Sequence, residues 1–346
     1  MAPLEASLRH FHIVEELFRS NNGAVYKVRR KTGRKELLCL KERKFAELGR
    51  KRDIMNEVRL LEKANHPNVI KCFGHFWEVS SGSLFMVLEY VDGGDLYNML
   101  LKRRTVRQFL SEDEIWSLFY QICLGVHHLH TNGIIHRDIK TLNIMLSKDM
   151  RTAKLADLGV SRQVSQDTLF LRTFYGTPLY ASPELCQNKP YNEKTDIWSL
   201  GVVLYEMAAL TPPFNAESIM GLAEAITKGE YRPMPSNYSD SLSNMVAQML
   251  QVDPSKRPSM ATLLSYFQQS PDGAAGKDGG TQQNSSAHES QGGEQGGSLT
   301  RHKSRDGHML PDLEDEYVGM VGDPERNVRG GGGGGGGGHS GDAGKR

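Results

Sequence analysis

The chain has 346 residues, of which 38% are hydrophobic, and a formal net charge of +1. This length allows one large folded domain or two small ones, and a charge so close to zero argues against a broad basic surface, so we expect no nucleic-acid partner. No stretch reaches the ~20 apolar residues of a membrane-crossing helix, so we also expect no membrane span.

Strand patterns dominate the first ninety residues. Strand-like runs occur within residues 11–40, including 24–28 and 36–40, and again near 69–77 and 84–90. Between them, Ile54, Val58 and Leu61 recur at three- and four-residue steps, which predicts a helix over 51–64. We therefore expect an antiparallel sheet accompanied by one helix.

Helical patterns follow a short linker at residues 91–95. Apolar spacing predicts helices over 96–103 and 112–130. The second is preceded by Ser111, and Glu114 three residues later completes a capping box. The expected fold class is α+β, with a β-rich front and an α-helical back.

The last part of the chain has a different composition. Of the 36 glycines, 22 follow residue 268, and residues 330–338 are all glycine. Tyr317 is the only aromatic residue in this part, so residues 268–346 cannot bury enough apolar surface to offset their conformational entropy, and we expect a disordered tail. Residues 309–318 mix apolar and acidic side chains, which suits either a short motif for a tail-binding partner or a solvated stretch.

Cysteine and histidine spacing gives no metal pattern. The four cysteines lack paired metal-ligand spacing and suit a reducing, intracellular compartment. The histidines at 127, 128 and 130 lack a carboxylate or cysteine at ligand spacing, which disfavours zinc.

One polar loop has the residues that phosphoryl transfer requires. In the sequence His-Arg-Asp-Ile-Lys-Thr-Leu-Asn at 136–143, Asp138 can accept the proton of an attacking hydroxyl and Lys140 can neutralise phosphoryl charge. Asn143 offers a neutral oxygen to a metal ion, and Asp157 follows fourteen residues later in Asp-Leu-Gly. The alternative is an ordinary polar loop between two strands.

These motifs resemble those of the eukaryotic serine/threonine protein kinases, whose usual Asp-Phe-Gly is Asp-Leu-Gly here. The resemblance implies a bilobal kinase fold that uses ATP and Mg²⁺ and acts on protein substrates. It also implies an order of domains: an N-terminal extension at 1–10, a kinase domain at 11–267 with N-lobe 11–90, hinge 89–95 and C-lobe 96–267, and the tail at 268–346.

The resemblance assigns roles to the charged residues. Asp138 is expected to be the base, with Lys140 and Lys41 as phosphate clamps. Asn143 and Asp157 are expected to bind Mg²⁺. In the family, the counterpart of Lys41 is held by an ion pair to a helix glutamate, which is Glu57 in this chain.

The same resemblance predicts a nucleotide pocket. Leu88 is the gatekeeper, and the backbones of Glu89 and Val91 contact adenine. The other expected contacts are the ribose neighbour Asp95, the purine-sandwiching Val25, Cys39 and Met145, and Gly23 of the phosphate loop. That loop departs from Gly-x-Gly-x-x-Gly because Phe18 and Ser20 replace its first two glycines, so backbone amides approach phosphates less easily.

Regulatory and scaffolding residues are implied as well. Thr173 matches the usual activation-loop phosphorylation site, and Arg137 matches the arginine that binds the phosphate. Thr177 matches the residue that hydrogen-bonds the catalytic aspartate and lysine. Scaffolding roles are expected for Asp196, which braces the catalytic loop, and for the pair Glu184 and Arg257.

Lys140 and the Gly-Thr-Pro-Leu-Tyr sequence at 176–180 favour serine/threonine over tyrosine substrates, and the combined motifs look like those of the NIMA-related kinases. That family implies roles in the cell cycle, microtubules, centrosomes or cilia, so we expect a cytoplasmic, cytoskeletal or nuclear location. No heptads follow residue 267, and we expect a monomer. The alternative is a pseudokinase or scaffold, which the depleted glycine loop suggests; a small-molecule kinase is disfavoured by the complete segment 157–184.

Overall fold

The computed structural model describes residues 7–21, 23–33, 36–44, 51–157 and 178–269, with only the backbone for 51–54, 56, 57 and 269. The predicted disordered tail lies outside the described residues apart from its first two, and that prediction stays untested. Within the described ranges no helix is long and apolar enough to cross a membrane.

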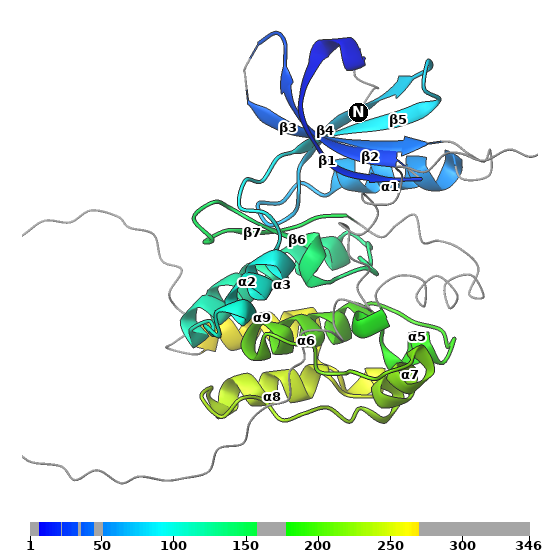
Figure 1. Cartoon of the computed structure of the whole chain (residues 1–346). Coiled ribbons are helices and arrows are strands. Elements are labelled where there is room, and N and C mark those ends of the chain that lie inside the picture. The colour runs from blue at the N-terminus through cyan, green and yellow to red at the C-terminus, as the bar shows by residue number, and fades with distance from the viewer. Residues whose placement is uncertain (1–6, 22, 34–35, 45–50, 158–177, 270–346) are drawn as a thin grey trace, which may run out of the picture. The chain divides into compact units, whose positions relative to one another are not determined.

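The predicted antiparallel sheet is confirmed (Figure 1). Its strands lie in the order β1-β2-β3-β5-β4. Their bounds are β1 Phe11–Ser20, β2 Gly23–Arg30, β3 Leu37–Lys44, β4 Cys72–Glu78 and β5 Ser83–Glu89. The strand expected from residue 69 begins only at Cys72, because Val69 and Ile70 pair instead with Leu155, which lies far along the chain.

The two faces of the sheet differ, and one of them carries an apolar core. Successive side chains of a strand point to opposite sides, and Leu38 and Leu40 of β3 are buried in a cluster with Phe76. Phe76 stacks on Phe11 and on Phe85, with ring centroids 5.9 and 5.4 Å apart. The other side of β3 therefore carries the alternate residues, among them Lys41, one of the two predicted phosphate clamps.

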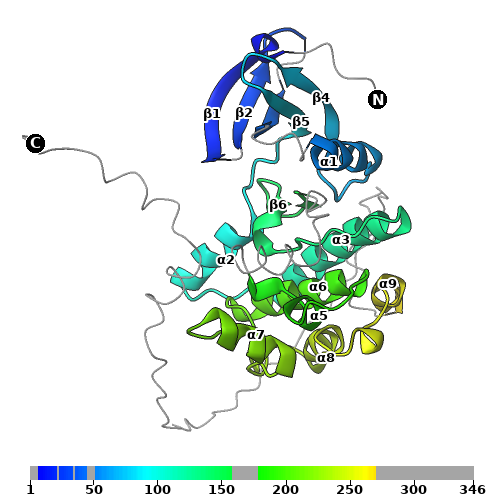
Figure 2. The ribbon, with the colours of Figure 1, turned by 90° about the vertical axis from the view of Figure 1, so that its right-hand side faces the viewer.

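Helix α1, Lys51–Lys63, confirms the predicted helix and lies beside the sheet against β4 (Figure 2). Val58 and Leu61 are buried, which fits the apolar spacing that predicted the helix.

The second half of the domain is mainly helical (Figure 1). Its helices are α2 Leu96–Thr105, α3 Glu112–Thr131, α5 Pro183–Cys186, α6 Lys194–Ala209, α7 Ile219–Lys228, α8 Asp240–Met249 and α9 Met260–Gln269. Short 3-10 turns occur at Leu8–His10, Thr141–Asn143, Pro178–Tyr180 and Pro254–Lys256. The capping box of α3 is confirmed: the Glu114 amide donates to Ser111 Oγ at 3.2 Å, and the Ser111 amide donates to the Glu114 carboxylate at 2.8 Å.

Helix α6 is the buried centre of this helical half. Nearly all of its residues are buried, including Trp198, which stacks on Phe214 at 5.4 Å. A side chain at Gly201 would come within 2.9 Å of Met249 and Leu250, so the glycine allows α6 to pack closely against α8. The loop at 136–143 contacts this helix through Asp196, whose carboxylate accepts from the backbone of His136 and Arg137.

A small hairpin connects the sheet side to the helical side. It consists of β6 Ile144–Leu146 and β7 Ala153–Leu155. Leu155 donates to the Asn68 carbonyl at 2.9 Å, and the Gly93 amide donates to the Leu146 carbonyl at 2.9 Å. The hairpin directly follows residues 136–143, so these bonds fix that loop relative to the sheet.

Candidate active site

The three side chains expected in the catalytic loop, those of Asp138, Lys140 and Asn143, lie together. Asn143 donates from Nδ2 to the Asp138 carboxylate at 2.9 Å and to the Asp138 carbonyl at 2.8 Å. Lys140 Nζ lies 3.2 Å from Asp138 Oδ2. Residues 141–143 form a 3-10 turn, and this turn brings Asn143 back toward Asp138, five residues earlier in the chain. The arrangement presents a carboxylate, an ammonium and an amide on one small surface.

Asp196 braces this loop, as predicted. Its carboxylate accepts backbone hydrogen bonds from His136 at 2.8 Å and Arg137 at 2.9 Å, and His130 Nε2 lies 2.8 Å away. Arg137 has a φ of 65°, an uncommon conformation for a residue with a side chain. The two backbone bonds to a buried carboxylate stabilise it there.

His136 lies in the interior of the loop. Its side chain is fully buried, and the backbone amide of Asp138 donates to its Nδ1 at 3.3 Å. Burial lowers the pKa of His136, although Asp196 and Asp138 act in the opposite direction. A neutral, buried imidazole fits a structural role for His136.

Asp157 meets two cations from the sheet. Lys41 Nζ forms an ion pair with Asp157 Oδ1, and Arg43 Nη2 lies 3.7 Å from the same oxygen. Removal from water opposes ionisation of this carboxyl, but the charges of Lys41 and Arg43 outweigh it and hold the pKa of Asp157 below its ordinary value. Asp157 is therefore a carboxylate throughout the physiological pH range.

The donor set suits magnesium. Asp157 follows Ala156, whose amide donates to the Asn143 carbonyl at 2.8 Å, so the two predicted metal ligands lie in directly bonded segments. A carboxylate and an amide oxygen are hard ligands, and Mg²⁺ is commonly held by one or two carboxylates plus substrate phosphates. No group of three or more His, Cys, Asp or Glu that could hold a metal occurs among the described residues.

The sheet brings the predicted nucleotide-pocket residues to one side. Lys41 is the cross-strand partner of Val25 on β2 and of Met86 on β5, and Cys39 is the partner of Leu88. Directly paired residues share a face of the sheet, so the apolar residues and the lysine are neighbours. Burial raises the pKa of the Cys39 thiol to about 11, so this cysteine behaves as an apolar lining residue.

The glycine loop has a packing role at its one retained glycine. Gly23 has a φ of +148°, and a side chain there would come within 2.1 Å of the Glu42 carbonyl oxygen. Phe18 pairs with Val25, so the side chain that replaces the first glycine lies on the face of the sheet that carries Lys41. Phe18 is 57% exposed.

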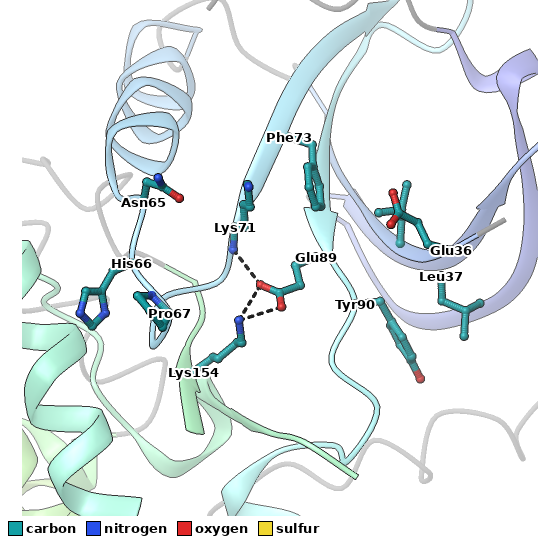
Figure 3. Close-up of a pocket in the computed structure, with 11 residues that line it drawn as sticks. Glu36, Leu37, Asn65, His66, Pro67, Lys71, Phe73, Glu89, Tyr90 and Lys154 are labelled. Atoms are coloured by element: carbon teal, nitrogen blue, oxygen red, sulfur yellow. Dashed lines mark hydrogen bonds and ion pairs between the residues drawn. The ribbon is translucent and has the colours of Figure 1, made fainter. Parts of the chain in front are cut away.

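Glu89, at the start of the predicted hinge, forms an ion pair with Lys154 (Figure 3). The Lys154 ammonium contacts both oxygens of the Glu89 carboxylate, at 2.7 and 3.0 Å, and the backbone amide of Lys71 donates to the same carboxylate at 3.3 Å. The Glu89 amide donates to the Lys71 carbonyl at 2.9 Å. These residues border a cavity of about 610 Å³ that also involves Phe73 and Tyr90.

Two other pocket residues have structural contacts. Asp95 caps α2 by accepting from the Asn98 amide at 2.8 Å, and it forms an isolated backbone bridge with Met145 on β6. The bridge brings the expected ribose neighbour beside the expected purine neighbour. Val91 follows the last residue of β5 by two positions and is half-buried.

A buried acidic network lies beneath the catalytic loop. Tyr180 donates to the Glu206 carboxylate, Thr141 Oγ1 lies 3.3 Å from the same carboxylate oxygen, and the Thr141 and Tyr180 hydroxyls are 2.8 Å apart. Burial raises the pKa of Glu206 to about 7, despite the hydrogen bonds from Tyr180 and Thr141. The network connects the catalytic loop to the 178–180 turn through α6.

The predicted pair of Glu184 and Arg257 is confirmed. Two parallel hydrogen bonds of 2.8 Å join the guanidinium to the carboxylate, and both residues are buried. Burial opposes ionisation of Glu184, but its bonds to Arg257 lower its pKa. Arg257 also lies over the Trp198 ring, 5.0 Å from the centroid.

Three predicted residues lie outside the described part of the chain. They are Thr173 and Thr177 within 158–177, and the side chain of Glu57. Their roles stay predictions. Arg137 is described, and its guanidinium lies 5.4 Å from the Tyr191 ring centroid.

Sequence reasoning missed three charged residues that the structure brings to the site. Arg43 follows Lys41 by two positions, so strand alternation alone could have revealed it. Lys154 and Glu206 gave no local signal, because their partners lie 65 and 26 residues away in the sequence.

Comparison with known proteins agrees with this geometry. Residues 11–267 match the protein kinase domain family. The chain is 47% identical over 208 residues to the serine/threonine-protein kinase Nek5 of Homo sapiens. The aligned region covers 60% of this chain and 29% of that protein. It is 40% identical over 260 residues to Nek5 of Mus musculus, covering 74% and 40% respectively.

The serine/threonine-protein kinase Nek2 of Homo sapiens is 37% identical over 249 residues, covering 70% of this chain and 56% of that protein. The chain thus spans between 29% and 56% of the length of these three relatives. The shared region is the kinase domain: the chain belongs to the protein kinase family, and its domain is a serine/threonine kinase domain of the NIMA-related type.

Proposed function

We propose that this protein transfers the γ-phosphoryl group of ATP to serine or threonine hydroxyls of other proteins. The observation that carries the proposal is the convergence of Asp138, Lys140 and Asn143 in one loop, beside Asp157 and Lys41. Phosphoryl transfer requires positioning and charge stabilisation more than covalent chemistry. These side chains supply both.

Asp138 orients the attacking hydroxyl and accepts its proton. The amide of Asn143 holds one carboxylate oxygen of Asp138 at 2.9 Å, which fixes its direction toward the substrate. Lys140, 3.2 Å from the same oxygen, is close enough to neutralise charge on the phosphoryl group as it moves toward the hydroxyl.

Lys41 binds the α- and β-phosphates once it leaves Asp157. Asp157 and Asn143 would hold Mg²⁺, which shields the phosphate charges when bound. Lys41 and Asp157 form an ion pair in the structure, so nucleotide binding exchanges that pair for contacts to phosphate. Glu57 is proposed as the residue that then orients Lys41.

The purine is proposed to lie between Val25, Cys39 and Met145. The amide of Glu89 is bonded to Lys71, so the adenine contact from Glu89 falls to its carbonyl, and Val91 supplies the matching amide. Leu88 closes the back of the pocket, Asp95 contacts the ribose, and Gly23 lies near the phosphates.

A radiolabel transfer assay tests the proposal. The full chain is incubated with Mg²⁺, γ-labelled ATP and a generic protein substrate, and the labelled amino acid is identified. We expect label on serine or threonine, loss of label with Asp138→Asn, and ordinary activity with the control Asp149→Asn, an exposed acid in the β6–β7 turn. Equal labelling by wild type and Asp138→Asn would favour the scaffold alternative.

Control by phosphorylation is a second part of the proposal. Phosphothreonine at position 173 would pair with Arg137, because a phosphate carries nearly two negative charges and suits a guanidinium, and Thr177 would bond Asp138 and Lys140. Thr173→Ala should lower activity, and Thr173→Ala protein with full activity would contradict this.

A location in the cytoplasm, at the cytoskeleton, centrosome or cilium, or in the nucleus is proposed from the Nek resemblance, and a fluorescent fusion tests it.

A further inference from the structure

Arg43 lies on the cleft side of β3, next in line after Lys41. Side chains two residues apart on a strand share a face. Leu38 and Leu40 occupy the core on the opposite face, so Cys39, Lys41 and Arg43 form a row on the nucleotide side. The row runs away from Glu89, because Cys39 pairs with Leu88 and Arg43 pairs with Leu84.

Arg43 and Lys41 reach the same oxygen of Asp157. Lys41 forms the closer ion pair, and Arg43 Nη2 is 3.7 Å from Oδ1. The Arg43 side chain is 28% exposed and that of Asp157 is 45% exposed. Two positive charges therefore meet one carboxylate at a point that remains accessible to a ligand.

The chemistry of a guanidinium suits a second ligand there. A separation of 3.7 Å exceeds the ~2.7–3.2 Å of an N–H···O hydrogen bond, so Arg43 interacts with Asp157 mainly through charge. A guanidinium has five N–H donors in a planar fork, and this fork binds two phosphate oxygens at once. The same guanidinium can serve a carboxylate and a phosphate.

The glycine loop gives a reason for an extra cation. Phe18 and Ser20 carry side chains where backbone amides usually approach the phosphates. Gly23 is retained, and a side chain there would come within 2.1 Å of the Glu42 carbonyl oxygen on β3. The backbone amides at Phe18 and Ser20 thus approach phosphates less easily than those of glycines, while β3 offers one more positive charge.

We propose that Arg43 is a second cation of the phosphate site, binding the terminal phosphates of ATP together with Lys41. This inference rests on ATP being the substrate, as proposed above. Asp157 would hold Mg²⁺, and the two cations that contact it here, Lys41 and Arg43, would then bind phosphate oxygens.

Equilibrium binding to nucleotides with different numbers of phosphates tests the inference. The full chain and Arg43→Gln are titrated calorimetrically with adenosine, ADP and ATP, first in EDTA and then with Mg²⁺. We expect Arg43→Gln to weaken ATP binding by about tenfold or more, ADP binding by less, and adenosine binding by under about twofold. The expected order holds with and without Mg²⁺.

Two further variants act as controls. Lys44→Gln removes a neighbouring exposed charge from the opposite face of β3 and should leave all three affinities unchanged. Arg43→Lys keeps the charge but loses the planar fork, so it should recover only part of the ATP affinity that Arg43→Gln loses, and a partial recovery excludes misfolding as the cause.

Several outcomes would overturn the inference. An equal loss for adenosine and ATP would mean that Arg43 supports the fold, and a loss only with Mg²⁺ would mean that it acts through Asp157 alone. Unchanged ATP affinity in Arg43→Gln would also refute it while leaving the proposed kinase function intact. Wild-type protein that binds no ATP would refute both.

Discussion

Glu206 is the buried acid whose replacement should reveal the network beneath the catalytic loop. Its pKa of about 7 compares with an ordinary 4.5. At a pH above 7, where Glu206 is ionised in the folded protein, this difference lowers the free energy of unfolding by roughly 3 kcal/mol. The folded state binds this proton more tightly than the unfolded state. The contribution of the Glu206 proton to the free energy of unfolding is therefore fully present below about pH 4.5 and is lost as the pH rises through about 7.

Glu206→Gln removes the titration and keeps an oxygen that accepts from Tyr180. Relative to wild type, the variant should gain free energy of unfolding as the pH rises, by about 2 kcal/mol between pH 5.5 and 8. Its hydrogen bonds change as well, but that effect does not vary with pH.

Urea unfolding of both proteins at pH 5.5, 6.5, 7.5 and 8 measures this difference. Glu217→Gln, at an exposed acid, is the matched control and should show a difference from wild type that is flat with pH. A flat difference for Glu206→Gln would refute the reasoning, because it would mean that Glu206 is ionised in the folded protein at all four pH values.

Three other predictions concern stability and nucleotide binding. Arg257→Leu leaves the buried Glu184 carboxylate without its bidentate partner and should lower the free energy of unfolding by roughly 3–5 kcal/mol, as measured by denaturant titration; a loss under 1 kcal/mol would contradict the buried pair. Ser111→Ala removes the cap of α3 and should cost about 1 kcal/mol in the same assay, whereas no change would mean that the cap is redundant. Ser20→Gly should lower the KM for ATP in steady-state kinetics, and an unchanged KM would show that the loop binds phosphate by another route.

Periodicity predicted the elements of the domain well. The apolar steps at Ile54, Val58 and Leu61 predicted α1, and the Ser111 capping box predicted the start of α3. These are local properties, set by side-chain spacing and by the backbone amides at a helix end. The strand expected from residue 69 was wrong at its start because Val69 pairs with Leu155, a contact that local sequence does not encode.

The catalytic loop was recognisable because its residues are close in sequence as well as in space. Asp138, Lys140 and Asn143 lie within one short loop, so their spacing carried the prediction. The contacts of Lys41 with Asp157 and of Lys154 with Glu89 join segments 116 and 65 residues apart. Which charges meet across such separations depends on how the sheet and the helical half pack, and hydropathy patterns do not determine it.

The most direct test of the central claim measures transfer rate and ATP affinity on the same pair of proteins, wild type and Asp138→Asn. A positioned base contributes about 10²–10⁴-fold to rate, so kcat for phosphorylation of a serine-containing protein should fall at least about a hundredfold, with the Kd for ATP within about twofold. A kcat that is unchanged in Asp138→Asn would contradict the account, as would a loss of rate fully explained by weaker ATP binding.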